Sequence, residues 1–221
     1  MSKRAIYLGG KRGAGGPTTT TSTTTWQVSN GGDDGTGVHG STVLSAGVAS
    51  VVAGNDVEMG VVNIGYYAFF RFLNVGIAQG ATIDDAKLTL RTSQSSDGGA
   101  EIGDLDLYDF KVDALDVDDS TRPSDGNDVN ENATTTSAVV NWPLTSSVSD
   151  DADLDTPEIK TVLQEVVNRS GWSSGNDITF RVYNAKTSEG NPMGLSDCHL
   201  QCWSYDQNTS KAGKLVVTYT Q

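Results

Sequence analysis

The sequence has little of the residue types on which most enzymes and disulfide-rich domains depend. Its 221 residues include only two histidines and two cysteines. Two cysteines are too few for a disulfide scaffold, and two histidines give acid–base catalysis little to work with. No apolar run approaches the roughly 18 residues that span a bilayer. We therefore expect neither a disulfide-stapled domain nor a membrane-spanning one.

Basic residues are also scarce, with 15 Lys and Arg against 28 Asp and Glu, a net charge of −13. An acidic surface repels nucleic-acid phosphates and anionic lipid headgroups, so we expect no nucleic-acid or membrane partner. The chain begins with basic Lys3 and Arg4, but no apolar segment of the kind found in secretory signals follows them. We therefore expect no secretory signal.

Motifs of enzymes and metal sites are weak or missing. No Gly-x-Ser-x-Gly elbow is present, and the glycine-rich stretch 9–16 lacks the Gly-Lys-Ser/Thr ending of a phosphate loop. Cys198, His199 and Cys202 offer three zinc ligands without an evident fourth. On a strand, the two cysteines would lie about 13 Å apart, beyond disulfide reach. We expect a non-enzyme with free thiols.

What the sequence does contain is a series of short strand patterns separated by Gly, Asp, Asn and Ser. Apolar and polar residues alternate over 86–91, 178–183 and 215–220, which is typical of half-buried antiparallel strands. Further strands are expected near 43–52, 67–73, 102–112, 137–142 and 195–203. The pattern predicts an all-β sandwich.

One amphipathic helix interrupts the strands, at about residues 157–168. Thr156 is a suitable N-cap, and Pro157 suits the first helical position. The apolar residues that follow recur at helical spacing on one stripe: Ile159, Val162, Leu163, Val166 and Val167. We expect this stripe to close the core of the sandwich.

The first 40 residues differ in composition from the rest, so we divide the chain into an extended N-terminal arm, 1–40, and a domain, 41–221. The arm holds a Thr/Ser run ending at Trp26, and such a segment buries too little apolar area to fold alone. We expect it to bind a partner through Thr18, Thr21, Thr25 and Trp26. The alternative is an arm that folds back over its own domain.

Three blocks in the domain point to a family. They are Phe69–Phe72 with 80–83 and 86–90, then Val139–Trp142 with the helix and 171–176, and finally Lys214–Tyr219. In order and spacing they resemble DNRLRE-type jelly-roll domains, which are similar to carbohydrate-binding modules. The resemblance covers about 43–221 and implies a two-sheet jelly roll with a short helix. Such domains are non-catalytic and occur in settings from secreted polysaccharide-degrading enzymes to bacteriophage virion proteins.

Two acidic clusters are candidate calcium sites. Asp151, Asp153 and Asp155 alternate along the chain, so their carboxylates can converge on one hard cation. A second cluster comprises Asp113, Asp116, Asp118 and Asp119. The resemblance adds that modules of this type often hold a structural calcium. The alternative is a solvated acidic loop with no cofactor.

Apart from Trp26 of the arm, the tryptophans divide into two groups. Trp142 and Trp172 lie in blocks that are expected to be structural, whereas Trp203, with Tyr205 nearby, is the best remaining platform for stacking a sugar. The alternative for Trp203 is burial in the core near the last hairpin.

These features leave three hypotheses for function. The first is a structural protein of a viral particle of a tailed phage, a capsid decoration or cement protein or a tail accessory, which contacts further copies of itself and other virion proteins such as the major capsid protein. The second is a carbohydrate-binding or adhesive module that recognises surface glycans. The third is a subunit of an extracellular filament whose arm is a donor strand. We favour the first and expect localisation to the virion, with an extracellular location as the alternative.

Overall fold

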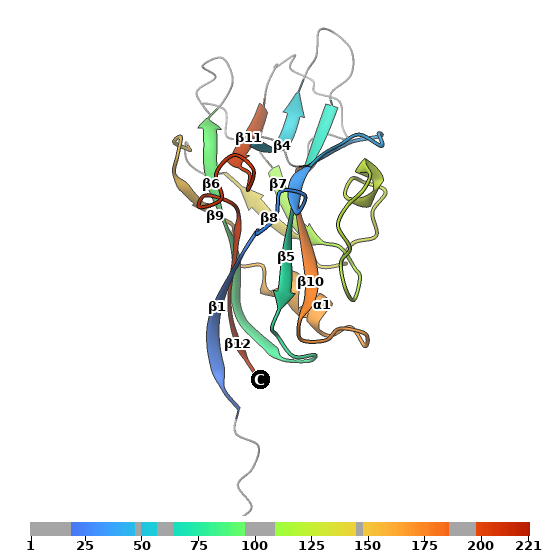
Figure 1. Cartoon of the computed structure of the whole chain (residues 1–221), viewed down its shortest axis with the longest axis vertical. Coiled ribbons are helices and arrows are strands. Elements are labelled where there is room, and N and C mark those ends of the chain that lie inside the picture. The colour runs from blue at the N-terminus through green and yellow to red at the C-terminus, as the bar shows by residue number, and fades with distance from the viewer. Residues whose placement is uncertain (1–18, 47–49, 57–63, 96–108, 145–147, 186–197) are drawn as a thin grey trace, which may run out of the picture.

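The computed structural model describes residues 19–46, 50–56, 64–95, 109–144, 148–185 and 198–221 (Figure 1). The strands, in chain order, are β1 (Thr21–Gln27), β2 (Asp34–Val38), β3 (Leu44–Ala46), β4 (Ser50–Asp56), β5 (Ile64–Val75), β6 (Thr82–Ser95), β7 (Asp109–Ala114), β8 (Val140–Pro143), β9 (Asp153–Asp155), β10 (Asn176–Asn184), β11 (Cys198–Trp203) and β12 (Lys214–Thr220). A short 3-10 helix, η3 (Gly126–Asp128), and one α-helix, α1 (Lys160–Val167), complete the described elements.

The strands form two antiparallel sheets, as the predicted sandwich requires. One sheet has the order β1-β12-β6, with β9 beside β6. The other has the order β11-β4-β5-β10-β7-β8, with β2 beside β5 and β3 beside β2. The long strand β6 joins them, because it pairs with β12 over 82–89 and with β11 over 92–95. The predicted all-β class with one helix is confirmed.

The alternation that predicted the strands also sets which side chains face inward. In β12, Leu215, Val217 and Tyr219 are buried while the residues between them are half-buried. The strand expected over 102–112 is described only from Asp109, because 102–108 lie outside the described residues. The strand expected over 137–142 begins later, at Val140.

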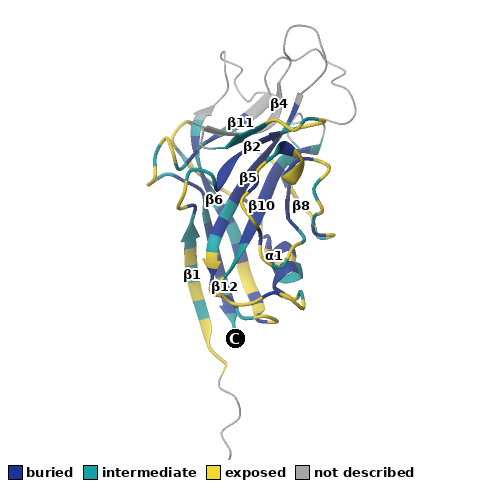
Figure 2. Ribbon diagram, turned by 45° about the vertical axis from the view of Figure 1, so that its right-hand side comes forward, coloured by how far each residue is buried: buried dark blue, intermediate teal, exposed yellow. Residues whose placement is uncertain are grey.

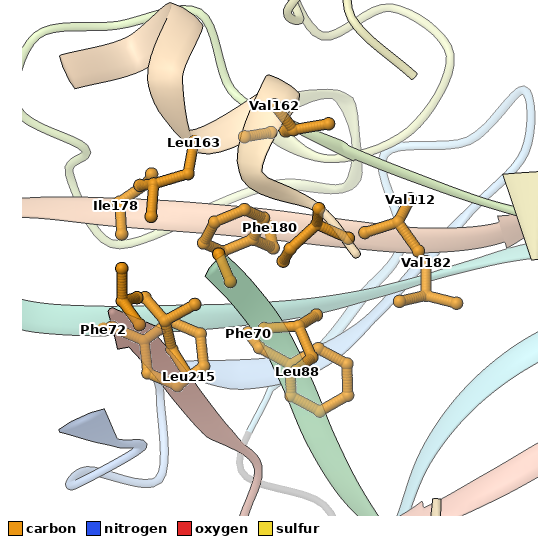
Figure 3. Close-up of a cluster of buried hydrophobic side chains, with 14 of the residues drawn as sticks. Phe70, Phe72, Leu88, Val112, Val162, Leu163, Ile178, Phe180, Val182 and Leu215 are labelled. Atoms are coloured by element: carbon orange, nitrogen blue, oxygen red, sulfur yellow. The ribbon is translucent and has the colours of Figure 1, made fainter. Parts of the chain in front are cut away.

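The core lies between the two sheets and the helix (Figure 3). One sheet contributes Leu88 from β6 and Leu215 from β12, and the other contributes aromatic rings of β5 and β10. Phe72 and Phe180 meet edge to face with their ring centroids 6.2 Å apart. All these side chains are fully buried, and burial of this kind is the main source of stability in a domain of this size.

Helix α1 carries the predicted apolar stripe, and every residue of that stripe is buried. It begins later than predicted, at Lys160, because Thr156 does not cap it. The Thr156 hydroxyl instead accepts a hydrogen bond from the Leu88 N–H (3.0 Å), which extends the pairing of β9 with β6. The N-cap is Ile159, whose side chain makes no capping hydrogen bond, and the carboxylate of the preceding Glu158 accepts the Lys160 N–H (2.9 Å).

The helix closes the core by bridging the two sheets. Gln164 accepts the N–H of Ile83 at the start of β6 (2.8 Å). The Glu165 carboxylate accepts the N–H groups of Ser137 and Ala138, just before β8 in the other sheet (2.7 and 2.8 Å). Within the described part of the chain, no helix has the length and apolar character needed to cross a bilayer.

Candidate functional site

Two strands of the sheets come from the segment predicted as an arm. Strand β1 pairs with β12 along its whole length, from Thr21 opposite Thr220 to Gln27 opposite Lys214, and β2 pairs with β5. The fold therefore takes in residues well before Ser41, and over 21–38 the chain folds back on its own domain, the alternative considered above. The edge of β12 offers backbone groups to pair, and β-branched threonine fits an extended strand. Thr18 lies outside the described residues.

Three threonines of β1, Thr21, Thr23 and Thr25, lie on the outer face of the sheet. The hydroxyls of Thr21 and Thr220 are 2.7 Å apart, and those of Thr23 and Thr218 are 2.8 Å apart. Thr21, Thr23 and Thr25 are exposed, and Figure 2 shows exposed and intermediate bands along β1. This face is a ladder of neutral hydroxyl groups that bond across the strands.

Trp26 lies on the inner face and fixes β1 to its own domain. Its indole N–H donates to the Asn74 carbonyl (3.3 Å), and its ring lies 6.5 Å from that of Tyr219. The side chain is half-buried by these contacts and packs against the core. Trp26 thus anchors the strand within the chain itself, and its binding to a partner stays a prediction.

The outer edge of β1 has no partner among the described strands. Thr20 and Gln221 exchange backbone hydrogen bonds, and the Val28 N–H donates to the Gly213 carbonyl, so the even-numbered residues make the ladder with β12. In an antiparallel pair the residues between them point their N–H and C=O groups the other way. These outward groups belong to Thr21, Thr23, Thr25 and Gln27. Figure 1 shows β1 at the margin of the molecule.

This edge also lacks the devices that usually prevent strand pairing. Natural proteins protect exposed edges with charged residues, proline or bulges. Strand β1 reads TSTTTWQ, with no charged residue and no proline, and its register with β12 runs without a shift. The outer edge of β1 therefore carries none of the features that would hinder pairing with another strand.

The first predicted calcium cluster is neutralised by basic side chains of the chain itself. Asp151 accepts hydrogen bonds from Arg91 Nε (3.1 Å) and Lys211 Nζ (2.6 Å), and these donors lower the pKa of Asp151 to about 2. Asp153 pairs with the same arginine, and Asp155 with the lysine of β6, Lys87.

Three of the four carboxylates of the second cluster are paired in the same way, whereas Asp119 accepts the N–H of Asp177 (2.8 Å). Asp113 is fully buried and forms a bidentate ion pair with Arg181, whose Nε and Nη2 donate to the two carboxylate oxygens (2.8 and 2.6 Å). Asp116 and Asp118 both pair with Arg169. Within the described residues, no three His, Cys, Asp or Glu side chains form a group that could hold a metal ion.

A third acidic group escaped the sequence analysis, because Asp33 and Asp34 lie in the Gly-rich stretch that was assigned to the arm. Asp33 is fully buried and pairs with Arg71 (2.7 Å). Asp34 is equally buried; one carboxylate oxygen accepts the Tyr205 N–H (2.8 Å), and the other has no partner. Burial raises the pKa of Asp34 to about 7, and the nearby carboxylate of Asp206 adds to the rise.

The predicted sugar platform is only partly accessible. Trp203 is half-buried, and Lys211 Nζ lies 4.4 Å from the centroid of its ring, so the ammonium group covers part of that face. Tyr205 packs against the core, and its backbone joins the last turn to Asp34.

Cys202 carries a free thiol, as expected. The side chain is buried in apolar surroundings, and this burial raises its pKa to about 12. The thiol is therefore protonated and unreactive at neutral pH. The side chains of Cys198 and His199, the other residues of the proposed zinc motif, lie outside the described set.

Taken together, the most distinctive surface is the free edge of β1 with its threonine face. It offers backbone groups that pair with no other described strand, and neutral hydroxyls beside acidic side chains such as Asp84. No family model matches the chain, and no curated protein matches its sequence.

Proposed function

We propose that this protein is a non-catalytic structural component of a virus particle. It serves a tailed phage as a capsid decoration or cement protein, or as a tail accessory, and its sandwich has jelly-roll topology. The observation that carries the proposal is the free, unprotected edge of β1, which suits attachment by strand addition. The resemblance to DNRLRE-type jelly-roll domains allows this setting, since such domains occur in bacteriophage virion proteins as well as in secreted polysaccharide-degrading enzymes.

The distribution of charge supports attachment through the N-terminal segment. Positions 1–18 hold four basic residues and no acidic one, whereas the rest of the chain has 28 acidic and 11 basic residues. A basic segment that precedes β1 is attracted to the acidic surface of a neighbouring copy or another virion protein. Strand addition and charge attraction together join subunits without a large apolar interface.

Immunogold electron microscopy tests this function. An antibody raised against the purified chain should label virus particles from the same source at regular positions, on the head for a decoration protein or on the tail for an accessory. Particles without label would overturn the proposal. Binding to a glycan array that is lost in Trp203→Ala would instead support the carbohydrate-binding module.

A further inference from the structure

We propose that the strand which docks on β1 is β1 of a second copy, paired antiparallel about a two-fold axis through Thr23. The inference rests on the proposed function for its biological setting and names the first partner in the assembly. The two copies would then share one continuous sheet in the order β12-β1-β1-β12.

The backbone of β1 satisfies the symmetry of this pairing. The outward groups belong to odd-numbered residues, and a two-fold axis at Thr23 places odd residues opposite odd residues. Thr23 then exchanges two hydrogen bonds with the Thr23 of the other copy, and Thr21 exchanges two with its Thr25. Each outward N–H in this stretch thus meets an outward carbonyl.

The side chains are as self-complementary as the backbone. Residues 21–25 read TSTTT, so on the outer face the new pairs are threonine opposite threonine. On the inner face, Ser22 lies opposite Thr24. Cross-strand hydroxyl pairs already form between β1 and β12, at 2.7 and 2.8 Å, so the dimer would repeat an existing contact.

Electrostatics favour this edge over the rest of the surface as a contact between identical copies. Each copy has a net charge of −13, and like charges repel where acidic faces meet. Strand β1 carries no charge, and its opposite residues from Val216 to Thr220 are also uncharged. Two copies therefore meet along this edge without bringing like charges into contact.

Light scattering on the full chain tests the dimer across a range of concentrations. The wild type should show a dimer that strengthens with concentration. Thr23→Lys and Thr23→Glu should each be monomeric, because the symmetry sets like charges directly opposite. An equimolar mixture of the two variants should recover the dimer, and Thr218→Lys, on the same face one strand inward, should keep it.

Cysteine pairs test the register. Residues in a hydrogen-bonded antiparallel pair have Cα atoms about 5.5 Å apart, within disulfide range. Thr23→Cys should form a cross-linked dimer on oxidation. Thr21→Cys alone should not, whereas a mixture of Thr21→Cys with Thr25→Cys should. The wild type, oxidised in parallel, controls for the native cysteines.

Two proline variants distinguish a loss of dimerisation from a loss of folding stability. The Thr23 N–H points outward, so Thr23→Pro should remove the dimer and melt near the temperature of the monomeric Thr23→Lys variant. The Thr24 N–H belongs to the ladder with β12, so Thr24→Pro should lower the melting temperature as well.

The outcomes distinguish this inference from the proposed function. A wild type that is monomeric at every concentration, with no cross-link through Thr23→Cys, overturns the dimer even if virus particles are labelled. A dimer that dissociates in Thr23→Lys supports the inference even if the particles carry no label.

Discussion

Two regions of the molecule use the same chemistry in opposite environments. Behind the loop that joins β7 to β8, the side chains of Arg181 and Asp113 are only 5% and 2% exposed. Beside β9, Arg91 meets Asp151 and Asp153 with side chains that are 30%, 52% and 67% exposed. Both regions were predicted as calcium clusters, and in both a basic side chain meets the carboxylates.

Burial decides what these ion pairs do. Arg181 also donates to the carbonyls of Val129 and Asn130, so it fastens the β7–β8 loop to the sheet from within. Removing one partner there leaves an uncompensated buried charge, whereas an exposed pair exchanges its partner for water. The following predictions test this difference, from the largest expected effect to the smallest.

The most severe test places a new carboxyl group in the core without a basic partner. Val162 is fully buried on the stripe of α1, so Val162→Asp should cost about 5 kcal/mol or more in unfolding free energy. Urea unfolding followed by circular dichroism measures it. The neighbouring Thr161 is exposed, so Thr161→Asp is the matched control and should unfold near the wild-type midpoint. Equal midpoints for Val162→Asp and the wild type would mean that the stripe does not face the core.

The second test breaks the buried ion pair. Asp113→Asn leaves the Arg181 guanidinium buried without a counter-charge, and we expect a loss of about 3–5 kcal/mol in unfolding free energy. Because the pair is shielded from solvent, the loss should be nearly the same at low and at high salt. A loss below about 1 kcal/mol would place this pair with the exposed ones.

The third test concerns a buried carboxyl group, that of Asp34, which pairs with no basic side chain among the described residues. The pKa of Asp34 is about 7 in the folded state, above its ordinary value of 3.8, so the folded state holds this proton more tightly than the unfolded chain. The resulting stability is fully present below about pH 4 and is lost as the pH rises through 7. The loss should reach up to roughly 4 kcal/mol at pH 8.

Asp34→Asn isolates this contribution. The amide oxygen can still accept the Tyr205 N–H, and the amide does not ionise. The difference in unfolding free energy between variant and wild type should therefore grow in favour of the variant between pH 4 and pH 8. A difference that stays constant over this range would show that Asp34 keeps an ordinary pKa.

The smallest effect is expected at the exposed cluster. Asp151→Asn should leave the urea midpoint nearly unchanged at neutral pH, and high salt should erase any remaining difference. The lowered pKa of Asp151 means that its small contribution is present above about pH 4 and lost toward pH 2. Thermal unfolding with calcium or with a chelator should give the same midpoint. A rise with calcium would show that the cation displaces the basic side chains.

The sequence predicted the helix stripe and most strands because these features are local. Residues 159–167 repeat at helical spacing and 215–220 alternate, and each pattern alone specifies a buried face. The prediction of Thr156 as the N-cap was wrong because its hydroxyl bonds to the Leu88 N–H, 68 positions away in the chain, a contact that the local pattern does not contain.

The contacts that the sequence analysis did not predict join residues far apart in sequence. A threonine run reads as an extended arm until an edge such as β12, near the other end of the chain, is known to be free for pairing. Asp151 resembles a metal ligand until Arg91 and Lys211 are brought beside it, 60 positions away on either side. Composition and local pattern predict charge and secondary structure, but they do not predict which distant residues come into contact.

The pairing of β1 with β12 has a mechanical consequence. Since Thr20 and Gln221 form a hydrogen-bonded pair, β1 starts at the point where β12 ends. A pull on the residues before β1, directed away from the body along the strand, loads all seven residue pairs at once in shear. A pull between those residues and the C terminus opens the pairs one after another. The force needed to separate β1 from β12 therefore depends on its direction: it is high for a pull along the strand and low for a pull that opens the pairs from the end.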